Sequence, residues 1–170
     1  QFSLVVIDDE KTIRDGIEAA LKSEYAVRSF AAAEEAIDEI KTSPPDLVLL
    51  DIGLPGMDGI EALTKIKELY PDVLVIMITA FEDAKTVISA MKLGAYDYVL
   101  KPIVMGGLRV TIKNALETIR LRKEVKVLQE NYLKENIPFF IAQSNKIQEI
   151  MDFITKAAQS ADAPILILGE

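Results

Sequence analysis

Neither cysteine nor histidine occurs anywhere in this 170-residue chain. Without cysteine, disulfide bonds and thiolate chemistry are excluded. Without histidine, a Ser-His-Asp triad and most zinc sites are excluded as well. Any metal ion must therefore be bound by oxygen ligands, which favours a hard cation such as Mg²⁺.

Long apolar segments are also missing. The longest uninterrupted apolar runs are far too short to cross a bilayer, and no charged-then-apolar signal pattern opens the sequence. We therefore expect no membrane contact and a cytoplasmic location. Half of the residues are apolar and 27% are charged, which predicts a globular core. The length of 170 residues predicts one domain of ordinary size with an appendage.

Charge is unevenly distributed along the chain. The formal net charge is −8, yet residues 1–103 carry 10 Lys and Arg against 19 Asp and Glu, whereas residues 104–137 carry 7 against 4. An acidic first part repels DNA phosphates, which disfavours direct nucleic-acid binding by that part. The basic stretch lacks regularly interleaved aromatic residues, so we interpret it as the solvated face of a helix.

Strand-like and helix-like segments alternate along the first hundred residues. The predicted strands cover residues 3–8, 25–30, 46–51, 73–79 and 96–100, with segments of helical period between them. The third and fourth runs are apolar at nearly every position, as expected of central strands that helices cover on both faces. The predicted fold is therefore α/β, with a doubly wound five-stranded parallel sheet.

A long helix is predicted from Leu108 to about Lys134, where no Gly or Pro interrupts the helical pattern. Its first apolar stripe suits docking on the sheet and consists of Leu108, Ile112, Ala115 and Ile119. Its second stripe has a coiled-coil spacing and consists of Leu121, Val125, Leu128 and Tyr132. We expect the second stripe either to pair with a second copy of the chain or to pack within the chain.

Reactive residues stand at the ends of four predicted strands, namely Asp8 and Asp9, Asp51, Thr79 and Lys101. The carboxyl ends of parallel strands share one edge of a sheet, where ligands bind, so these side chains are expected to meet. Carboxylates roughly 5 Å apart repel by about 3 kcal/mol per pair at an effective dielectric of about 20. Such a cluster requires a cation, and Mg²⁺ opposite the Lys101 ammonium satisfies it.

A carboxylate held beside Mg²⁺ and an ammonium can attack a phosphoryl donor, because both cations neutralise the charge that develops on the phosphoryl oxygens. Asp51 is the expected nucleophile, and Thr79 offers its hydroxyl to a phosphoryl oxygen. Taken singly, these residues also have structural interpretations: Asp8 and Asp9 as a helix N-cap, Thr79 as a strand end, and Lys101 as a solvated charge. Their joint position at strand ends argues against coincidence.

At these residues the chain resembles the receiver domain of bacterial response regulators, the CheY-like family, whose fold is the flavodoxin-like sheet predicted above. The resemblance covers about residues 3–120 and is carried by residues 5–10 (VVIDDE), 51–59 (DIGLPGMDG), 79–80 (TA), 94–98 (GAYDY) and 101–102 (KP). It implies that Asp51 accepts a phosphoryl group from a sensor histidine kinase. It implies further that Mg²⁺ is bound by Asp9, Asp51 and the Gly53 carbonyl, with Asp8 helping through water.

The resemblance also assigns roles to three other residues. Lys101 would contact the phosphoryl group, and Thr79 with Tyr98 would form a switch pair that reports phosphorylation to the surface around the fourth helix and fifth strand. The physical logic agrees, because roughly 1.5 to 2 added negative charges draw the Thr79 hydroxyl inward and free space for an aromatic ring.

Two features depart from the family pattern. Residues 103–107 (IVMGG) follow Lys101-Pro102 where many members have an acidic stretch, and the paired glycines predict a weak start for the last helix. At the positions that tune phosphoryl lifetime in the family, Gly53 and Phe81 offer no side chain that could position an attacking water. We therefore expect slow autodephosphorylation.

Residues 139–170 are similar to the opening of the AAA+ ATPase domain of NtrC-type, sigma-54-dependent transcription activators. A predicted helix capped by Ser144 and an apolar strand at 165–168 lead into Gly169-Glu170, the first two positions of a phosphate loop. Together with a start at Gln1, this predicts a piece of a longer protein: a receiver at 1–120, a linker helix at 121–138 and an AAA+ fragment at 139–170. ATPase activity and contacts with sigma-54 RNA polymerase and DNA would then belong to parts absent from this chain.

The leading hypothesis is a phosphoacceptor regulatory module, not itself an enzyme, that forms a homodimer through its receiver face and linker helix. A phosphohydrolase of the haloacid-dehalogenase type also uses a strand-end Asp, but it needs a second Asp two positions later, where Gly53 stands. A stand-alone signalling adaptor would leave the long helix and the Gly-Glu ending unexplained. A dinucleotide-binding domain is disfavoured because no G-x-G-x-x-G follows the first strand.

Overall fold

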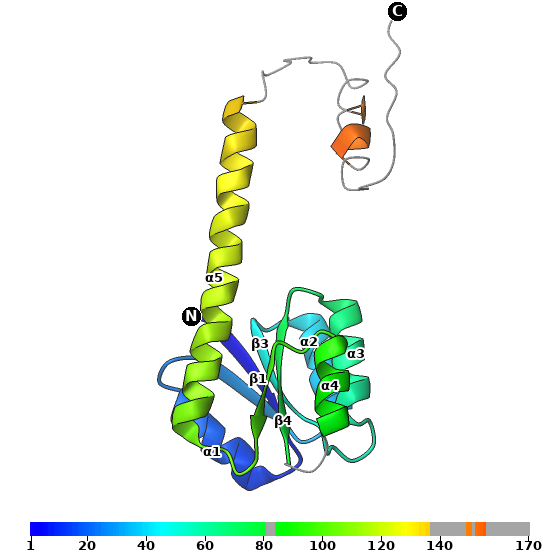
Figure 1. Ribbon diagram of the computed structural model, residues 1–170, viewed down its shortest axis with the longest axis vertical. Coiled ribbons are helices and arrows are strands. Elements are labelled where there is room, and N and C mark those ends of the chain that lie inside the picture. Colours follow the sequence, from blue (N-terminus) through cyan, green and yellow to red (C-terminus); the bar gives the residue numbers. More distant parts are fainter. Residues whose placement is uncertain (81–83, 137–148, 151, 156–170) are drawn as a thin grey trace, which may run out of the picture. The chain divides into compact units, whose positions relative to one another are not determined.

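The five predicted strands lie side by side as a parallel sheet in the computed structural model of the chain (Figure 1), in the order β2-β1-β3-β4-β5. The strands are β1 (Ser3–Ile7), β2 (Ala26–Phe30), β3 (Leu47–Asp51), β4 (Leu74–Thr79) and β5 (Asp97–Leu100). Each begins and ends within one residue of its predicted run, and the predicted doubly wound α/β fold is confirmed. The structure describes residues 1–80, 84–136, 149–150 and 152–155.

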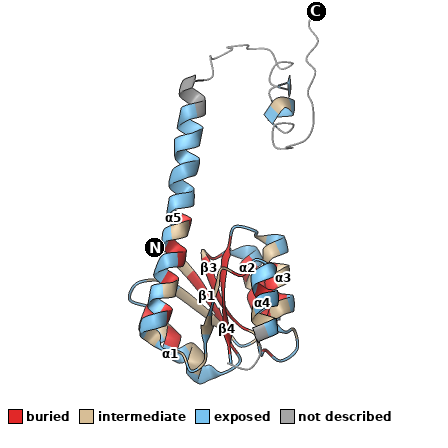
Figure 2. Ribbon diagram, in the orientation of Figure 1, coloured by how far each residue is buried: buried red, intermediate tan, exposed pale blue. Residues whose placement is uncertain are grey.

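Two layers of helices cover the sheet because successive side chains of a strand point to opposite faces. Leu4 and Val6 of β1 belong to the cluster that includes helices α1 (Lys11–Leu21) and α5 (Met105–Asn136). Val5 and Ile7 belong to the cluster that includes α2 (Ala33–Thr42), α3 (Gly59–Leu69) and α4 (Ala84–Lys92). Strands β3 and β4 are buried at every position, and Figure 2 shows buried residues along the strands and on the inward sides of the helices.

Acidic residues precede the N-terminal ends of both α1 and α3, but they differ in whether their side chains cap the helix. Helix α3 begins after Asp58, whose Oδ1 accepts hydrogen bonds from the N–H groups of Ile60 (2.9 Å) and Glu61 (2.8 Å). Helix α1 begins after Glu10, whose side chain makes no capping hydrogen bond. Neither Asp8 nor Asp9 is therefore the N-cap of α1, whereas Asp58 is the N-cap of α3.

Helix α5 docks on the sheet through its first apolar stripe, whose four members are no more than 8% exposed, as predicted. The helix begins at Met105, earlier than predicted, and it includes Gly106 and Gly107. Each glycine costs about 1 kcal/mol relative to alanine. Full burial of Leu108, and the bond from its N–H to the Val104 carbonyl (3.0 Å), offset that cost.

The second stripe of α5 lies open to solvent. Its exposed fractions are 51% for Leu121, 51% for Val125, 67% for Leu128 and 67% for Tyr132. The chain divides into two units, Gln1–Lys126 and Val127–Glu170, and beyond α5 the described residues 149–150 and 152–155 are helical. The predicted Ser144 cap, the strand at 165–168 and Gly169-Glu170 lie outside the described residues. Within the described part of the chain, no helix is long and apolar enough to cross a membrane.

Candidate functional site

Four strand ends converge on one edge of the sheet. The register pairs Ile7 of β1 with Leu50 of β3, which sets the following residues, Asp8 and Asp51, on adjacent strands. In the same way Thr79 of β4 pairs with Leu100 of β5, and Lys101 follows directly. Among the described residues, the buried polar and charged side chains are those of Asp8 (0% exposed), Asp51 (4%) and Thr79 (6%). All three lie at this edge, so the polar groups that the fold buries are concentrated in one place.

Three carboxylates and one ammonium form the centre of the site. One carboxylate oxygen from each of Asp8, Asp9 and Asp51 lies within 4.8 Å of the others, with Asp9 exposed. The Nζ of Lys101 lies 3.1 Å from Asp8 Oδ2 and 3.0 Å from Asp51 Oδ2. The structure therefore brings the predicted carboxylates and Lys101 together, and the lysine lies against the two buried aspartates, Asp8 and Asp51.

The electrostatic environment shifts the pKa of two of these groups. Burial raises the pKa of the Asp8 carboxyl above its ordinary value, although the Glu10 N–H and Lys101 act in the opposite direction. Burial also lowers the pKa of the Lys101 ammonium, but its hydrogen bonds to carboxylates outweigh burial and raise that pKa overall. Lys101 is therefore charged across the neutral range, and negative charge on Asp8 is costly unless a further cation is near.

The donor set fits a hard divalent cation. Asp8 Oδ2 is the buried side-chain oxygen that, among the described residues, accepts no hydrogen bond, although it lies 3.1 Å from Lys101 Nζ. An unsatisfied carboxylate oxygen with two further carboxylates close by supplies the oxygen ligands that Mg²⁺ prefers. We find the residues present suited to Mg²⁺ on this ground.

Tight packing fixes the backbone around Asp51. A Cβ on Gly59 would lie 2.2 Å from the Asp51 carbonyl oxygen and 2.6 Å from Ile52 Cα, so only glycine fits at this point of close approach. Two residues after Asp51, the Gly53 N–H donates to Asp51 Oδ1 at 3.3 Å. The conformation of the phosphoacceptor candidate is thus set by backbone contacts from both glycines.

Two residues of the site were not among the predicted site residues. The Glu10 carboxylate lies 2.9 Å from Lys101 Nζ, and the Arg14 guanidinium donates to the backbone carbonyls of Asp8 and Asp9. Glu10 follows Asp8 and Asp9 directly, so a search for reactive residues that reached one position further past the end of β1 would have included it. Arg14 sits one turn into α1, and its contact depends on how that helix crosses the end of β1, which the sequence pattern does not show.

The predicted switch pair occupies neighbouring strands. The Thr79 hydroxyl donates to the Ala80 carbonyl at 2.9 Å, and the Thr79 carbonyl accepts from the Lys101 N–H at 2.7 Å. Tyr98 pairs in register with Met77 and is 43% exposed. Phe81, the second position expected to tune phosphoryl lifetime, lies outside the described residues.

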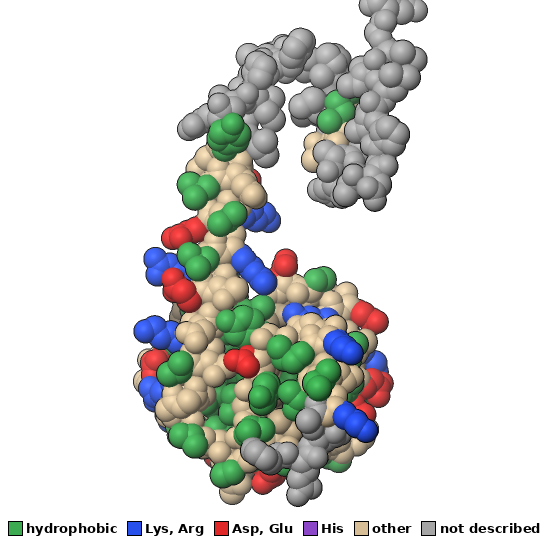
Figure 3. Space-filling model, viewed as in Figure 1, with side chains coloured by type: hydrophobic (Ala, Val, Ile, Leu, Met, Phe, Trp, Pro, Cys, Tyr) green, Lys and Arg blue, Asp and Glu red, His purple; other side chains and the backbone are tan. Residues whose placement is uncertain are grey.

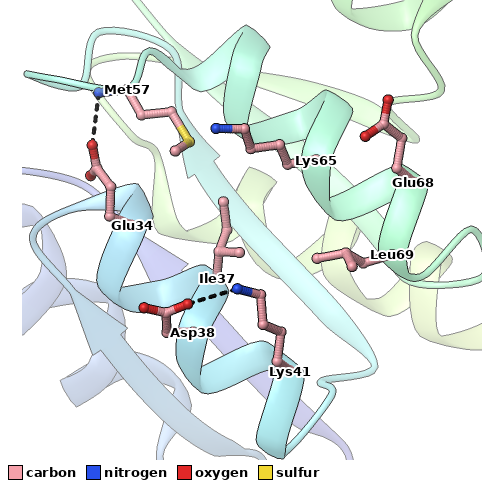
Figure 4. A pocket seen from close by; sticks show the side chains of 8 residues that line it. All are labelled: Glu34, Ile37, Asp38, Lys41, Met57, Lys65, Glu68 and Leu69. Carbon is pink, nitrogen blue, oxygen red and sulfur yellow. Dashed lines mark hydrogen bonds and ion pairs between the residues drawn. The ribbon is translucent and has the colours of Figure 1, made fainter.

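Two surface hollows differ in their relation to this site. One, of about 550 Å³, borders the edge of the sheet that carries Asp8, Asp9 and Asp51, called the acidic edge below. It is lined by Glu10 and Lys101 together with Thr12, Ile13, Gly16, Pro102, Ile103 and Met105. Another, of about 490 Å³, lies between α2 and α3 (Figure 4). There the Asp38–Lys41 ion pair (2.8 Å) and the bond from the Met57 N–H to Glu34 (3.1 Å) occupy polar groups of the lining. The chemistry of the candidate site is therefore at the acidic edge.

Comparisons with known proteins agree with this geometry. A family model described as the response regulator receiver domain matches residues 4–113. The nitrogen assimilation regulatory protein NtrX of Azorhizobium caulinodans is 34% identical over 169 residues, which are 98% of this chain and 36% of that protein. The DNA-binding transcriptional regulator NtrC of Proteus hauseri is 32% identical over 166 residues, which are 97% of this chain and 34% of that protein.

A solved structure gives the same result. The crystal structure of NtrX from Brucella abortus aligns with a TM-score of 0.73 at 31% identity, covering 92% of this chain and 34% of that one. The chain thus spans about a third of the length of each of these three proteins. With the sheet order, the acidic edge and the matched family model in agreement, the chain belongs to the response regulator receiver domain family, and its relatives include regulators of the NtrC type.

Proposed function

We propose that the chain is the phosphorylation-controlled receiver of a sigma-54-dependent transcription activator, with Asp51 as the phosphoacceptor. The observation that carries this proposal is the acidic edge, where three carboxylates approach within 4.8 Å and Lys101 Nζ lies 3.0 Å from Asp51 Oδ2. A carboxylate held between cations can attack phosphorus, because the cations neutralise charge on the transferred group.

Mg²⁺ is the cofactor of the proposed reaction. Asp9, Asp51 and the Gly53 carbonyl would hold it, with Asp8 acting through water, and the unsatisfied Asp8 Oδ2 supports that assignment. When bound, Mg²⁺ supplies positive charge for the carboxylates and for the oxygens of the phosphoryl group. Lys101 supplies the second positive charge from the side of the strand β5 end.

The proposed donor is the phosphohistidine of a sensor kinase. An Asp51 carboxylate oxygen forms a bond to phosphorus, the bond from phosphorus to the imidazole nitrogen breaks, and the electron pair leaves with that nitrogen. Lys101, now shared between carboxylates, would turn one N–H toward a phosphoryl oxygen. The hollow bordered by Glu10 and Lys101 gives the kinase access to the acidic edge.

Thr79 and Tyr98 are the proposed switch. The Thr79 hydroxyl is engaged only with the neighbouring Ala80 carbonyl among the described groups, so a new phosphoryl oxygen can compete for it. Tyr98 is exposed, which leaves its ring free to turn inward once Thr79 moves toward the phosphoryl group. The change would reach the face that carries α4 and β5.

A homodimer is part of the proposal. Figure 3 shows hydrophobic side chains gathered on the face that carries α4, where Ile88 (56%) and Met91 (42%) are exposed. The exposed second stripe of α5 supplies a further apolar surface. DNA and sigma-54 RNA polymerase would be contacted only by parts of the protein absent from this chain. We place the protein in the cytoplasm, where a sensor kinase would take its phosphoryl group from ATP.

The enzyme alternative gains no support at the site. A phosphohydrolase of the haloacid-dehalogenase type would need an acid-base carboxyl two residues after Asp51, and Gly53 has no side chain.

Phosphate uptake tests the proposal. The chain is incubated with Mg²⁺ and a small phosphodonor, and intact mass is measured for wild type and Asp51→Asn. We expect one phosphoryl group on wild type, none on Asp51→Asn, and none on wild type when Mg²⁺ is chelated. Equal uptake by both proteins would contradict the assignment of Asp51.

A further inference from the structure

The Lys101 ammonium contacts the carboxylate of Glu10 in addition to those of the two buried aspartates, Asp8 and Asp51. Its Nζ lies close to three carboxylates, and two of them accept a hydrogen bond from it, Asp51 Oδ2 at 3.0 Å and Glu10 Oε1 at 2.9 Å. The Asp8 oxygen at 3.1 Å receives no aligned hydrogen bond. Glu10 thus takes an N–H that Asp8, or a phosphoryl oxygen, would otherwise receive.

The backbone of Glu10 is fixed while its side chain is open to solvent. Its N–H donates to Asp8 Oδ1 at 2.9 Å, and its carbonyl accepts from the N–H groups of Ile13 (3.1 Å) and Arg14 (3.2 Å). The side chain is 54% exposed and borders the hollow of about 550 Å³ beside the acidic edge. A donor that enters through this hollow therefore passes the Glu10 carboxylate before it reaches Asp51.

Resting on the proposed function, we propose that Glu10 determines which phosphodonors react with Asp51, because its carboxylate holds one N–H of Lys101 and repels small, highly charged anionic donors. The chemical step is unchanged. An Asp51 oxygen forms the bond to phosphorus, the bond from phosphorus to the donor's oxygen or nitrogen breaks, and the electron pair leaves with that atom, as acetate from acetyl phosphate or as ammonia from N-protonated phosphoramidate.

The size of the effect follows from the geometry. Glu10 Oε1 and Asp51 Oδ2 each lie within about 3 Å of Lys101 Nζ, so they are no more than about 6 Å apart. A unit charge at about 6 Å changes a rate about threefold at the dielectric of water and more than about tenfold at an effective dielectric of about 20. Because Glu10 is half-exposed, we expect an effect between about threefold and about tenfold, reduced by salt.

Two small donors of different charge test the proposal. Acetyl phosphate is a dianion at neutral pH and phosphoramidate is a monoanion. The full chain and Glu10→Gln are compared at low salt, with Mg²⁺ saturating for each protein, by the second-order rate constant of phosphate uptake. We expect Glu10→Gln to react about threefold to about tenfold faster with acetyl phosphate, to gain less with phosphoramidate, and to lose the advantage at high salt.

Glu61→Gln is the matched control. Glu61 lies on α3 with a side chain 55% exposed, and it forms a comparable ion pair with Lys65 at 2.9 Å, but it does not line the hollow beside Lys101. We expect its rates to equal those of wild type with both donors.

The outcomes separate the inference from the proposed function. Unchanged or slower uptake by Glu10→Gln, or an equal gain with both donors at every salt concentration, would overturn the role of Glu10 while Asp51-dependent uptake by wild type still supports the proposed function. If wild type takes up no phosphate from either donor, both the proposed function and the role of Glu10 fall.

Discussion

The two ends of strand β3 each carry an aspartate, and the fold surrounds them in opposite ways. Asp46, just before the strand, accepts the Ser3 N–H on Oδ2 (2.9 Å) and lies 3.3 Å from Lys123 Nζ through Oδ1. Asp51, at the other end, shares Lys101 with the carboxylates of Asp8 and Glu10.

The difference separates a structural carboxylate from a reactive one. Asp46 has one amide donor and one cation for one negative charge, which satisfies it within the domain. At the Asp51 end several negative charges share one ammonium, and one buried oxygen of Asp8 accepts no hydrogen bond. Such a deficit of donors destabilises the folded state unless a group from outside the chain completes the site.

Gly59→Ala should have the largest effect on stability, because it disturbs the backbone at the Asp51 end. The added Cβ meets the Asp51 carbonyl oxygen at 2.2 Å, so the start of α3 must shift. We expect a loss of about 3 kcal/mol in the free energy of unfolding, measured by urea denaturation. Gly16→Ala is the control, since a Cβ there meets nothing within 4 Å, and it should stabilise α1 by up to about 1 kcal/mol. Equal effects of the two substitutions would contradict the close approach.

Gly53→Asn tests the expected slow autodephosphorylation. A Cβ at this position lies 3.9 Å from Asp51 Oδ2, an ordinary contact, so a side chain can begin here beside the acceptor without a clash at Cβ. The Asn amide can orient a water toward the phosphoryl group, and we expect the half-life of the phosphoprotein to fall by about tenfold, which corresponds to about 1.4 kcal/mol. Loss of label over time measures it, with Gly107→Ala as control, because an added Cβ there meets nothing within 4 Å and the residue does not line the hollow beside the site. A wild-type half-life of seconds would contradict the expectation itself.

Asp8→Asn should raise stability when Mg²⁺ is absent. Because burial raises the pKa of Asp8 in the folded state, its ionised form destabilises the fold at neutral pH. The folded wild type binds a proton more readily than the unfolded chain, so its stability should increase as pH falls from the raised pKa toward the ordinary value of 3.8. Asp8→Asn should lack this part of the pH dependence and be more stable at neutral pH by about 1 kcal/mol.

Mg²⁺ should reverse that order. A ligand at tenfold its Kd stabilises the folded state by about 1.4 kcal/mol, and we expect this gain in wild type but not in Asp8→Asn. Thermal denaturation with Mg²⁺ and with a chelator measures both effects. If Mg²⁺ stabilised the folded state of both proteins equally, the assignment of Asp8 to the metal site would be contradicted.

Lys123→Ala should have the smallest effect, because it removes only the exposed cation at the Asp46 end. The Lys123 side chain is 68% exposed and its ammonium lies 5.8 Å above the centre of the Phe2 ring. We expect a loss below about 1 kcal/mol in the free energy of unfolding, with unchanged phosphate uptake. A loss of uptake would show that the two ends of the sheet are coupled.

Most of the fold could be predicted from the sequence, because strands β1, β3 and β4 are short, largely apolar runs and helical periods separate the strand-like segments. The same rule placed Asp8, Asp51, Thr79 and Lys101 at one edge, since parallel strands end together. The early start of α5 was not predictable from local pattern, because burial of Leu108 outweighs the low helix propensity of the two glycines before it.

The parts of the site that escaped prediction depend on tertiary contacts. Arg14 reaches the Asp8 and Asp9 carbonyls only because α1 folds back across the end of β1, and Gly59 matters only because α3 begins against the Asp51 backbone. No spacing in the sequence encodes these distances. The roles in phosphoryl transfer assigned to the site residues stay predictions, namely those of Asp8, Asp9, Asp51, Gly53, Thr79, Tyr98 and Lys101.

Phosphate uptake by Asp51→Asn and Asp46→Asn, measured side by side by intact mass with Mg²⁺ and acetyl phosphate, tests the central claim most directly. Both substitutions remove one negative charge from an end of β3. We predict that Asp46→Asn takes up one phosphoryl group at the wild-type rate and that Asp51→Asn takes up none. Uptake by Asp51→Asn, or its loss in a folded Asp46→Asn, would contradict the assignment of phosphoryl transfer to the Asp51 end of the strand.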